Sequence, residues 1–188
     1  MKDSISGIDL SYRSYTVKQK AVRNAYKVYN SKDEEVLRTK QKLFKMKEEF
    51  PFTDPEGNEI FTVKAAQVMD FAGDYALTDS ETGKKIAVLK KEFSFLVHKW
   101  KIEDGNDNLI ASIESRGKLT GILRGFSSLF DMLPHKYSVK NSEGKEIGSI
   151  QQSFTLLRDK YRVEINNDVE DREALIAASI TIDALEGN

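Results

Sequence analysis

The sequence predicts a mainly β (α+β) protein, a closed antiparallel β-barrel of about twelve strands around a buried apolar C-terminal helix. Three observations carry this prediction. A hairpin-like unit recurs roughly every 25 residues, the last strand alternates apolar with charged residues, and an almost wholly apolar stretch lies near the C-terminus. We expect a flexible tail over residues 1–11 and one barrel domain over residues 12–188, with a helical insertion over residues 115–134.

The first predicted strand surrounds residues 15–18, and five hairpin-like stretches follow it. Each stretch opens with an aromatic residue, passes a polar turn and returns on an apolar residue, over residues 26–36, 50–60, 75–86, 100–110 and 137–147. The turns read NSKDEE, DPEGNE, DSETGKK, DGNDNL and NSEGKE. Asn or Asp begins every turn and can bond the backbone two residues on, and in four of the five a Gly can supply a positive φ. These features predict tight β-hairpins.

The insertion is visible as a break in the spacing. The next aromatic follows most hairpins after 14 or 15 residues, but 27 residues separate Ile110 from Tyr137. The last predicted strand, residues 161–165, alternates apolar with charged side chains, which is typical of a strand with one wet and one dry face. Closing the strands into a barrel removes the two exposed edges of the sheet. Side chains can fill the interior of a barrel of about eight strands, but a barrel of twelve strands is wider, so another segment has to fill its centre as a plug.

Residues 174–185 supply that plug, because they are apolar almost all round. Acidic residues near the expected helix start, including Asp171 and Glu173, favour a helix N-terminus there, although Ile180–Thr181–Ile182 would also suit a strand. At about 18 Å the helix is too short to cross a bilayer. The expected buried residues of this central helix are Leu175, Ile176, Ile180, Ile182 and Leu185.

The composition is that of a globular protein, with 31% charged and 39% hydrophobic residues. The chain has no Cys, which excludes disulfides, thiolate metal sites and palmitoylation and favours a reducing compartment. No apolar run near the N-terminus predicts a signal or transmembrane segment. We therefore expect a cytoplasmic protein without a transmembrane span, which could also associate peripherally with a membrane.

The ordered set of elements resembles the LURP-one-related family, within the group that includes the tubby C-terminal domain and the phospholipid scramblases. The resemblance covers roughly residues 12–186 and rests on Tyr15-Thr-Val-Lys-Gln-Lys20, on Tyr26-Lys-Val-Tyr-Asn30, on the repeated hairpins and on the final apolar helix. It implies a twelve-stranded barrel around a central helix. Tubby-like domains bind phosphoinositides through basic side chains, but those positions do not align residue by residue with this chain. The cysteine-rich stretch and inserted helix of scramblases are missing here.

No catalytic, metal-binding or cofactor-binding constellation is predicted. The two histidines, His98 and His135, share one repeat position whose equivalents are Glu48, Gly73 and Asp159, so we interpret it as a polar strand entry. The stretch Asp104-Gly-Asn-Asp-Asn108 lacks the Gly and Glu of a calcium loop and is explained as a turn. Nucleotide and nucleophile motifs are absent from the sequence, and its near-neutral net charge of −1 disfavours nucleic acid.

Charge is unevenly distributed along the chain. Residues 13–47 carry eleven Lys or Arg against three acidic residues, which could mark an anion-binding surface or could be the ordinary solvent face of a sheet. The candidate anion or headgroup site comprises Lys18, Lys20, Arg23, Lys40, Lys42, Lys45 and Lys47. Strand alternation would send some of these side chains to opposite faces.

The insertion has a second feature of interest, an apolar spacing of three and four residues with basic flanks. Such a face suits an anionic membrane surface or a partner groove, and a helix that packs on the barrel is the alternative. The candidate membrane or partner face comprises Leu119, Ile122, Leu123, Phe126, Leu129 and Phe130.

Three functional hypotheses remain at this point. The first is a non-enzymatic binding module that docks reversibly on anionic lipid or on a protein partner. The second is a regulatory or interaction scaffold that self-associates or binds protein without lipid. The third, a small-ligand carrier or an enzyme without a recognisable motif, requires a cavity that the helix leaves open.

Overall fold

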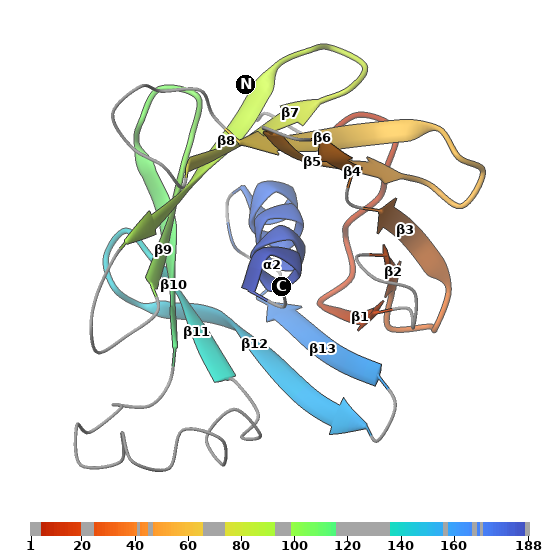
Figure 1. Cartoon of the computed structure of the whole chain (residues 1–188). Coiled ribbons are helices and arrows are strands. Elements are labelled where there is room, and N and C mark those ends of the chain that lie inside the picture. The colour runs from red at the N-terminus through yellow and green to blue at the C-terminus, as the bar shows by residue number, and fades with distance from the viewer. Residues whose placement is uncertain are drawn as a thin grey trace.

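The strands close into an antiparallel ring around one helix, as the sequence predicts (Figure 1). The computed structural model describes residues 5–19, 25–40, 42–44, 47–65, 74–92, 99–115, 136–155, 158–166, 169 and 171–186. The elements, in chain order, are β1 (Ser14–Gln19), β2 (Ala25–Tyr29), β3 (Glu35–Lys40), β4 (Lys42–Phe44), β5 (Lys47–Thr53), β6 (Glu59–Ala65), β7 (Asp74–Asp79), β8 (Lys85–Glu92), β9 (Lys99–Glu103), β10 (Leu109–Ser115), β11 (Lys136–Asn141), β12 (Glu146–Thr155), β13 (Arg158–Ile165) and α2 (Arg172–Glu186).

Two long-range pairings close the ring. The first strand, β1, pairs with the last, β13, and β3 pairs with β5. Although β3 and β4 are separate segments, both pair with β5 in one continuous register, with Arg38 opposite Thr53 and Phe44 opposite Lys47. They therefore act as one strand, and the predicted twelve-stranded barrel is confirmed.

Each of the five hairpins is built by the same local device. The first residue of the turn, Asn or Asp, accepts backbone N–H bonds with its own side chain, and the two strands shift in register next to the turn. The accepting residues are Asn30, Asp54, Asp79, Asp104 and Asn141. These short polar side chains satisfy turn N–H groups that the strand ladder cannot reach.

One detail of the turns differs from the sequence prediction. Three glycines have positive φ, namely Gly57, Gly83 and Gly144, but Gly105 does not. In its turn the left-handed residue is Asp107, with φ 64°, and in the first hairpin it is Asp33, with φ 61°. Asp tolerates this conformation because its short side chain can bond locally.

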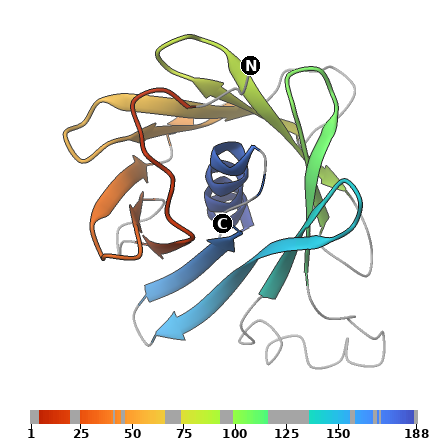
Figure 2. The same cartoon turned by 180° about the vertical axis from the view of Figure 1, so that it is seen from behind.

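The strands of the barrel surround α2, which lies in the middle of the ring (Figures 1 and 2). In β2, for example, the buried residues Tyr26 and Val28 alternate with residues of the outer face. All side chains from Ala174 to Ile182 are buried, so the helix is enclosed on all sides. The β-branched residues of this segment disfavour an isolated helix, but burial within the barrel overrides that weak propensity. Among the predicted plug residues Leu175, Ile176, Ile180 and Ile182 are buried, while Leu185 lies in α2 with its side chain outside the described residues.

The segment before β1 is fastened to the barrel, although the sequence analysis expects a flexible tail over residues 1–11. Ile5 and Leu10 are buried, and the backbone N–H of Ile5 donates to Glu173 Oε2 at 2.9 Å. The N–H of Ser6 donates to Asp79 Oδ2 at 2.7 Å. We call residues 5–12 the N-terminal strap. It joins the start of α2 to the β7–β8 turn.

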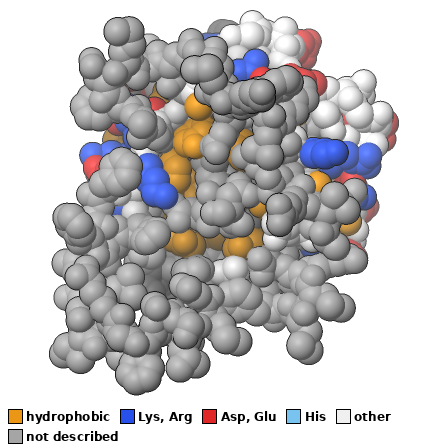
Figure 3. Space-filling view, viewed as in Figure 1, with side chains coloured by type: hydrophobic (Ala, Val, Ile, Leu, Met, Phe, Trp, Pro, Cys, Tyr) orange, Lys and Arg blue, Asp and Glu red, His pale blue; other side chains and the backbone are white. Residues whose placement is uncertain are grey.

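Seen from one end, hydrophobic side chains show at the centre of the ring and Lys and Arg at its rim (Figure 3). No helix in the described part of the chain combines the length and the apolar character that crossing a bilayer requires. The predicted insertion over residues 115–134 lies outside the described residues except for Ser115, which ends β10.

Candidate functional site

Four basic residues on successive strands form an unbroken row on the outside of the barrel. Lys160 of β13 is opposite Lys18 of β1, Lys18 is opposite Lys27 of β2, and Lys27 is opposite Arg38 of β3. Directly opposed residues have Cβ atoms about 5 Å apart, and like charges at that distance destabilise a sheet. We call these four residues the basic row.

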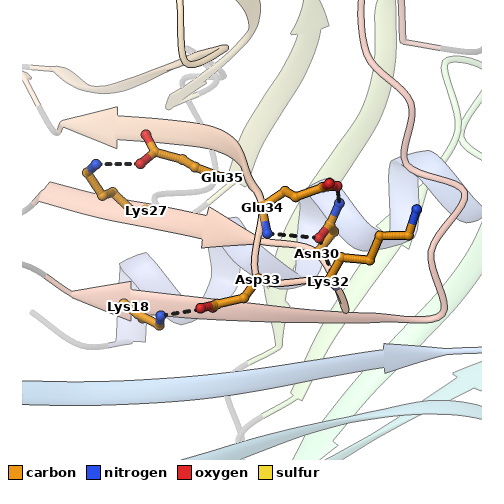
Figure 4. Close-up of polar contacts among 7 residues, drawn as sticks. All are labelled: Lys18, Lys27, Asn30, Lys32, Asp33, Glu34 and Glu35. Carbon is orange, nitrogen blue, oxygen red and sulfur yellow. Dashed lines mark hydrogen bonds and ion pairs between the residues drawn. The ribbon is translucent and has the colours of Figure 1, made fainter.

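Two carboxylates enter the row from the side and partly compensate this repulsion (Figure 4). Lys18 Nζ lies 3.2 Å from Asp33 Oδ1 in the β2–β3 turn. Glu35, at the start of β3, accepts from Lys27 and from Arg38, whose Nη2 lies 2.6 Å from Glu35 Oε1. Burial raises the pKa of Glu35, but the bonds from Lys27 and Arg38 outweigh it and hold that pKa below its usual value.

The two acids differ in how firmly they are held. The Asp33 side chain is 80% exposed and touches one lysine, whereas the Glu35 side chain is 16% exposed and contacts two basic groups. An exposed single ion pair contributes between about 0 and 1 kcal/mol. Asp33 is therefore the weaker and more easily displaced counter-ion of the basic row.

The β2–β3 turn places Asp33 beside β1. Asn30 Oδ1 accepts the backbone N–H groups of Lys32 at 2.9 Å and Glu34 at 3.1 Å, which folds the chain back tightly. The positive φ of Asp33 completes the turn. Nearby, Lys18 Nζ also lies 4.0 Å from the centre of the Tyr29 ring, a cation–π contact that further orients this lysine.

The outer face of β8–β11 has a different charge pattern. Two lysines, Lys90 and Lys101, are opposite each other, but Ser112 then interrupts their row. Each is close to a carboxylate, with Lys90 Nζ 2.6 Å from Glu103 and Lys101 Nζ 2.5 Å from Glu92. This face matches the ordinary solvated face of a sheet, while the basic row extends across four strands without interruption.

Two residues of the predicted anion site, Lys18 and Lys40, have described side chains. Lys18 is in the basic row, and Lys40 is exposed on β3, two residues beyond Arg38 on the same face. Lys42 and Lys47 lie on β4 and β5, but their side chains are outside the described residues. Lys20, Arg23, Lys45 and the whole predicted partner face from Leu119 to Phe130 also lie outside them.

Three members of the row, Lys27, Arg38 and Lys160, are not among the residues that sequence reasoning selected. A signal for them exists, because Lys27 lies between Tyr26 and Val28, and Lys160 and Arg162 flank Tyr161. Since the apolar neighbours point inward, strand alternation places these basic side chains outward. Only the registers of three strand pairs, β13 with β1, β1 with β2 and β2 with β3, show that they share one row.

A separate pocket of about 380 Å³ lies at one end of the barrel, between the β9–β10 and β11–β12 turns and the segment before α2. Much of its polar lining already serves the turns, because Asp104 accepts from Asn106 and Asn108 and Asn141 accepts from Glu143 and Lys145. Among the described side chains no group of three His, Cys, Asp or Glu could hold a metal ion, and both histidines lie outside them.

Comparison with known proteins identifies a family and a structural neighbour. The family model of the LURP-one-related proteins matches residues 35–183. A solved structure of a protein from Arabidopsis thaliana superposes with a TM-score of 0.55 at 9% sequence identity, and the match covers 94% of this chain and 93% of that chain. At this identity the likeness concerns the fold alone. A search of curated proteins found no match.

Proposed function

The chain belongs to the LURP-one-related family, and from this premise we propose that it is a non-enzymatic binding module that docks reversibly on anionic lipid through the basic row. The observation that carries the proposal is the cross-strand alignment of Lys160, Lys18, Lys27 and Arg38. The resemblance to tubby-like domains, which bind phosphoinositides through basic side chains, supports the choice of lipid. The module would act in the cytoplasm, at the surface of a membrane.

The expected affinity is modest. A basic residue near an anionic leaflet contributes about 1 kcal/mol, so the row contributes about 4 kcal/mol before Asp33 and Glu35 are counted against it. This corresponds to dissociation constants in the millimolar range. Binding of this kind is reversible and weakens with salt, because exposed charges are screened beyond about 10 Å at 0.1 M ionic strength.

Vesicle flotation tests the proposal, with phosphatidylcholine vesicles compared with vesicles that also contain phosphatidylserine. We expect the wild-type protein to float with the anionic vesicles at low salt and to be released at high salt. Lys18→Glu combined with Lys27→Glu should abolish flotation. Lys90→Glu combined with Lys101→Glu is the matched control, because these lysines are also opposed on neighbouring strands and carry similar exposure.

Two results would reject the lipid proposal. One is equal recovery of the wild type with neutral and anionic vesicles. The other is the same loss of flotation in both double variants, since that would mean that any lysine pair on the barrel contributes equally and that the basic row is not a site.

The second candidate is a scaffold that self-associates or binds protein through residues 119–133, whose apolar spacing favours a partner-binding helix. Deleting these residues should then change the oligomeric mass, measured by light scattering, or remove partners recovered by affinity capture. An unaltered mass and partner set would count against this candidate. The third hypothesis, a small-ligand carrier or enzyme, has less support, because α2 fills the middle of the barrel.

A further inference from the structure

Asp33 occupies a turn position where three of the other four hairpins have glycine. Its φ is 61°, in the left-handed region, and the corresponding residues Gly57, Gly83 and Gly144 have φ values of 99°, 68° and 80°. Glycine adopts this conformation without strain, whereas a residue with a Cβ pays a penalty there. An aspartate at this position brings a carboxylate to a place in the turn where glycine has no side chain.

The carboxylate of Asp33 contacts the basic row. Its Oδ1 lies 3.2 Å from Lys18 Nζ, which is in turn flanked across the strands by Lys27 and Lys160. The centre of the Tyr29 ring lies 4.0 Å from the same Lys18 Nζ. An anion beside Lys18 is thus close to basic residues of three strands, β13, β1 and β2. In the free protein the Asp33 carboxylate is such an anion.

We propose that Lys18, Lys27 and Lys160 form a phosphate subsite for a lipid headgroup, and that Asp33 is its internal competitor, which a headgroup phosphate displaces on docking. The inference rests on the proposed function, since it assigns the central subsite of the same row. Asp33 offers two oxygens to one ammonium group and is 80% exposed. A phosphate offers more acceptor oxygens to several ammonium groups, so the exchange favours the lipid.

Glu35 would keep its place during docking. It is bonded to both Lys27 and Arg38 and its side chain is only 16% exposed. Its role is to hold two members of the row in position. Of the two carboxylates that contact Lys18, Lys27 and Arg38, Asp33 is therefore the one that a headgroup displaces, and the effect of removing its charge can be measured with Glu35 still in place.

Asp33→Asn removes the charge and keeps a residue that tolerates positive φ. The matched control is Asp107→Asn, because Asp107 has the same conformation, φ 64°, in a turn remote from the basic row in the strand order. Flotation with vesicles of phosphatidylcholine and phosphatidylserine is measured against salt. Asp33→Asn should bind about threefold more tightly than wild type at low salt, the change that losing an exposed ion pair of ordinary strength corresponds to. The difference should vanish at high salt, and Asp107→Asn should bind like wild type.

The outcomes separate the two proposals. Equal binding by Asp33→Asn and wild type, with binding lost in the Lys18→Glu and Lys27→Glu double variant, overturns the competitor and leaves lipid docking intact. A wild type that ignores the anionic vesicles overturns both. A further arm replaces chloride by inorganic phosphate at equal ionic strength, where we expect at most a partial loss of flotation, because free phosphate competes for the subsite but not for the whole basic row. A complete loss in phosphate would mean that the subsite takes free phosphate in preference to a headgroup, which contradicts the lipid assignment.

Discussion

Arg172, the first residue of the central helix, donates from Nη1 to the carbonyl oxygen of Leu10 at 2.8 Å, and its Nη2 donates to the carbonyl oxygen of Tyr12. A positive charge at a helix N-terminus opposes the helix dipole. The hydrogen bonds to the N-terminal strap therefore have to offset that cost. They connect the two ends of the chain, since the strap precedes β1 and the helix follows β13.

The first prediction concerns this connection. Arg172→Met should lower the free energy of unfolding by about 1–2 kcal/mol. Hydrogen bonds to a charged group contribute about 1.5–3 kcal/mol, and removing the positive charge from the helix N-terminus offsets part of their loss. Urea denaturation measures the change. Arg162→Met is the control, because Arg162 is an exposed arginine bonded to Glu164 and Ser14 on the outer face. If both variants unfold at the same urea concentration, the hydrogen bonds of Arg172 to the strap contribute nothing to stability.

The second prediction compares two hydroxyls of the buried helix. Within the described part of the chain Ser179 Oγ is buried and has no hydrogen-bond partner, while Thr181 Oγ1 donates to the Ala177 carbonyl oxygen at 2.9 Å. Ser179→Ala should raise the free energy of unfolding by up to about 1 kcal/mol, since it removes an unsatisfied polar group and introduces a better helix former.

Thr181→Ala should lower the free energy of unfolding by about 1–2 kcal/mol, because it removes a satisfied hydrogen bond and a packed methyl group. Thermal unfolding followed by circular dichroism compares the two variants. Destabilisation of Ser179→Ala as large as that of Thr181→Ala would show that the Ser179 hydroxyl has a partner in solution.

The turns can be predicted from the sequence, whereas the basic row cannot. Turn chemistry is local, so Asn or Asp at the start of each hairpin is enough to predict the fold of the turn. The prediction of a positive φ at Gly105 is wrong. Gly105 is the first residue after Asp104, whereas the left-handed conformation falls on the third residue after it, Asp107. The row depends on the register between Lys18 and Lys160, two residues far apart in the sequence. A pattern in single strands cannot supply that register, so the sequence predicts Lys18 as a site residue but not Lys160.

The third prediction concerns a close approach between β12 and β13. A Cβ added at Gly148 would lie 2.3 Å from the carbonyl oxygen of Glu164 and 2.7 Å from Ile165 Cδ1. Gly148→Ala should therefore cost about 3 kcal/mol or prevent folding, because the backbone of β13 has to move. Gly57→Ala is the control, since its Cβ would meet nothing within 4 Å and only its φ of 99° is unfavourable.

We expect the Gly57 variant to lose about 1 kcal/mol. Denaturant unfolding gives both values, and the soluble yield on expression reports a variant that does not fold. Equal losses at the two positions would mean that the contact between Gly148 and β13 is loose.

The last prediction concerns stability at alkaline pH. Tyr15 is 1% exposed, and burial raises its pKa from 10.0 to about 12, although the N–H that Tyr12 donates to its hydroxyl opposes the shift. Because the pKa of Tyr15 is higher in the folded protein than in the unfolded chain, folding favours the protonated hydroxyl. The stability that this protonated hydroxyl contributes is fully present below pH 10 and is lost as the pH rises from 10 towards 12. The loss should reach about 2–3 kcal/mol over that window.

Tyr15→Phe should cost about 1 kcal/mol at neutral pH, since the Tyr12 N–H loses its acceptor, and it should flatten the alkaline loss. Tyr29→Phe, on the outer face of β2, leaves Tyr15 in place and should keep the wild-type slope. Urea denaturation at a series of pH values measures the free energy of unfolding of all three proteins. Parallel curves for wild type and Tyr15→Phe above pH 10 would show that the Tyr15 hydroxyl ionises in the fold as readily as in the unfolded chain, and hence that water reaches it.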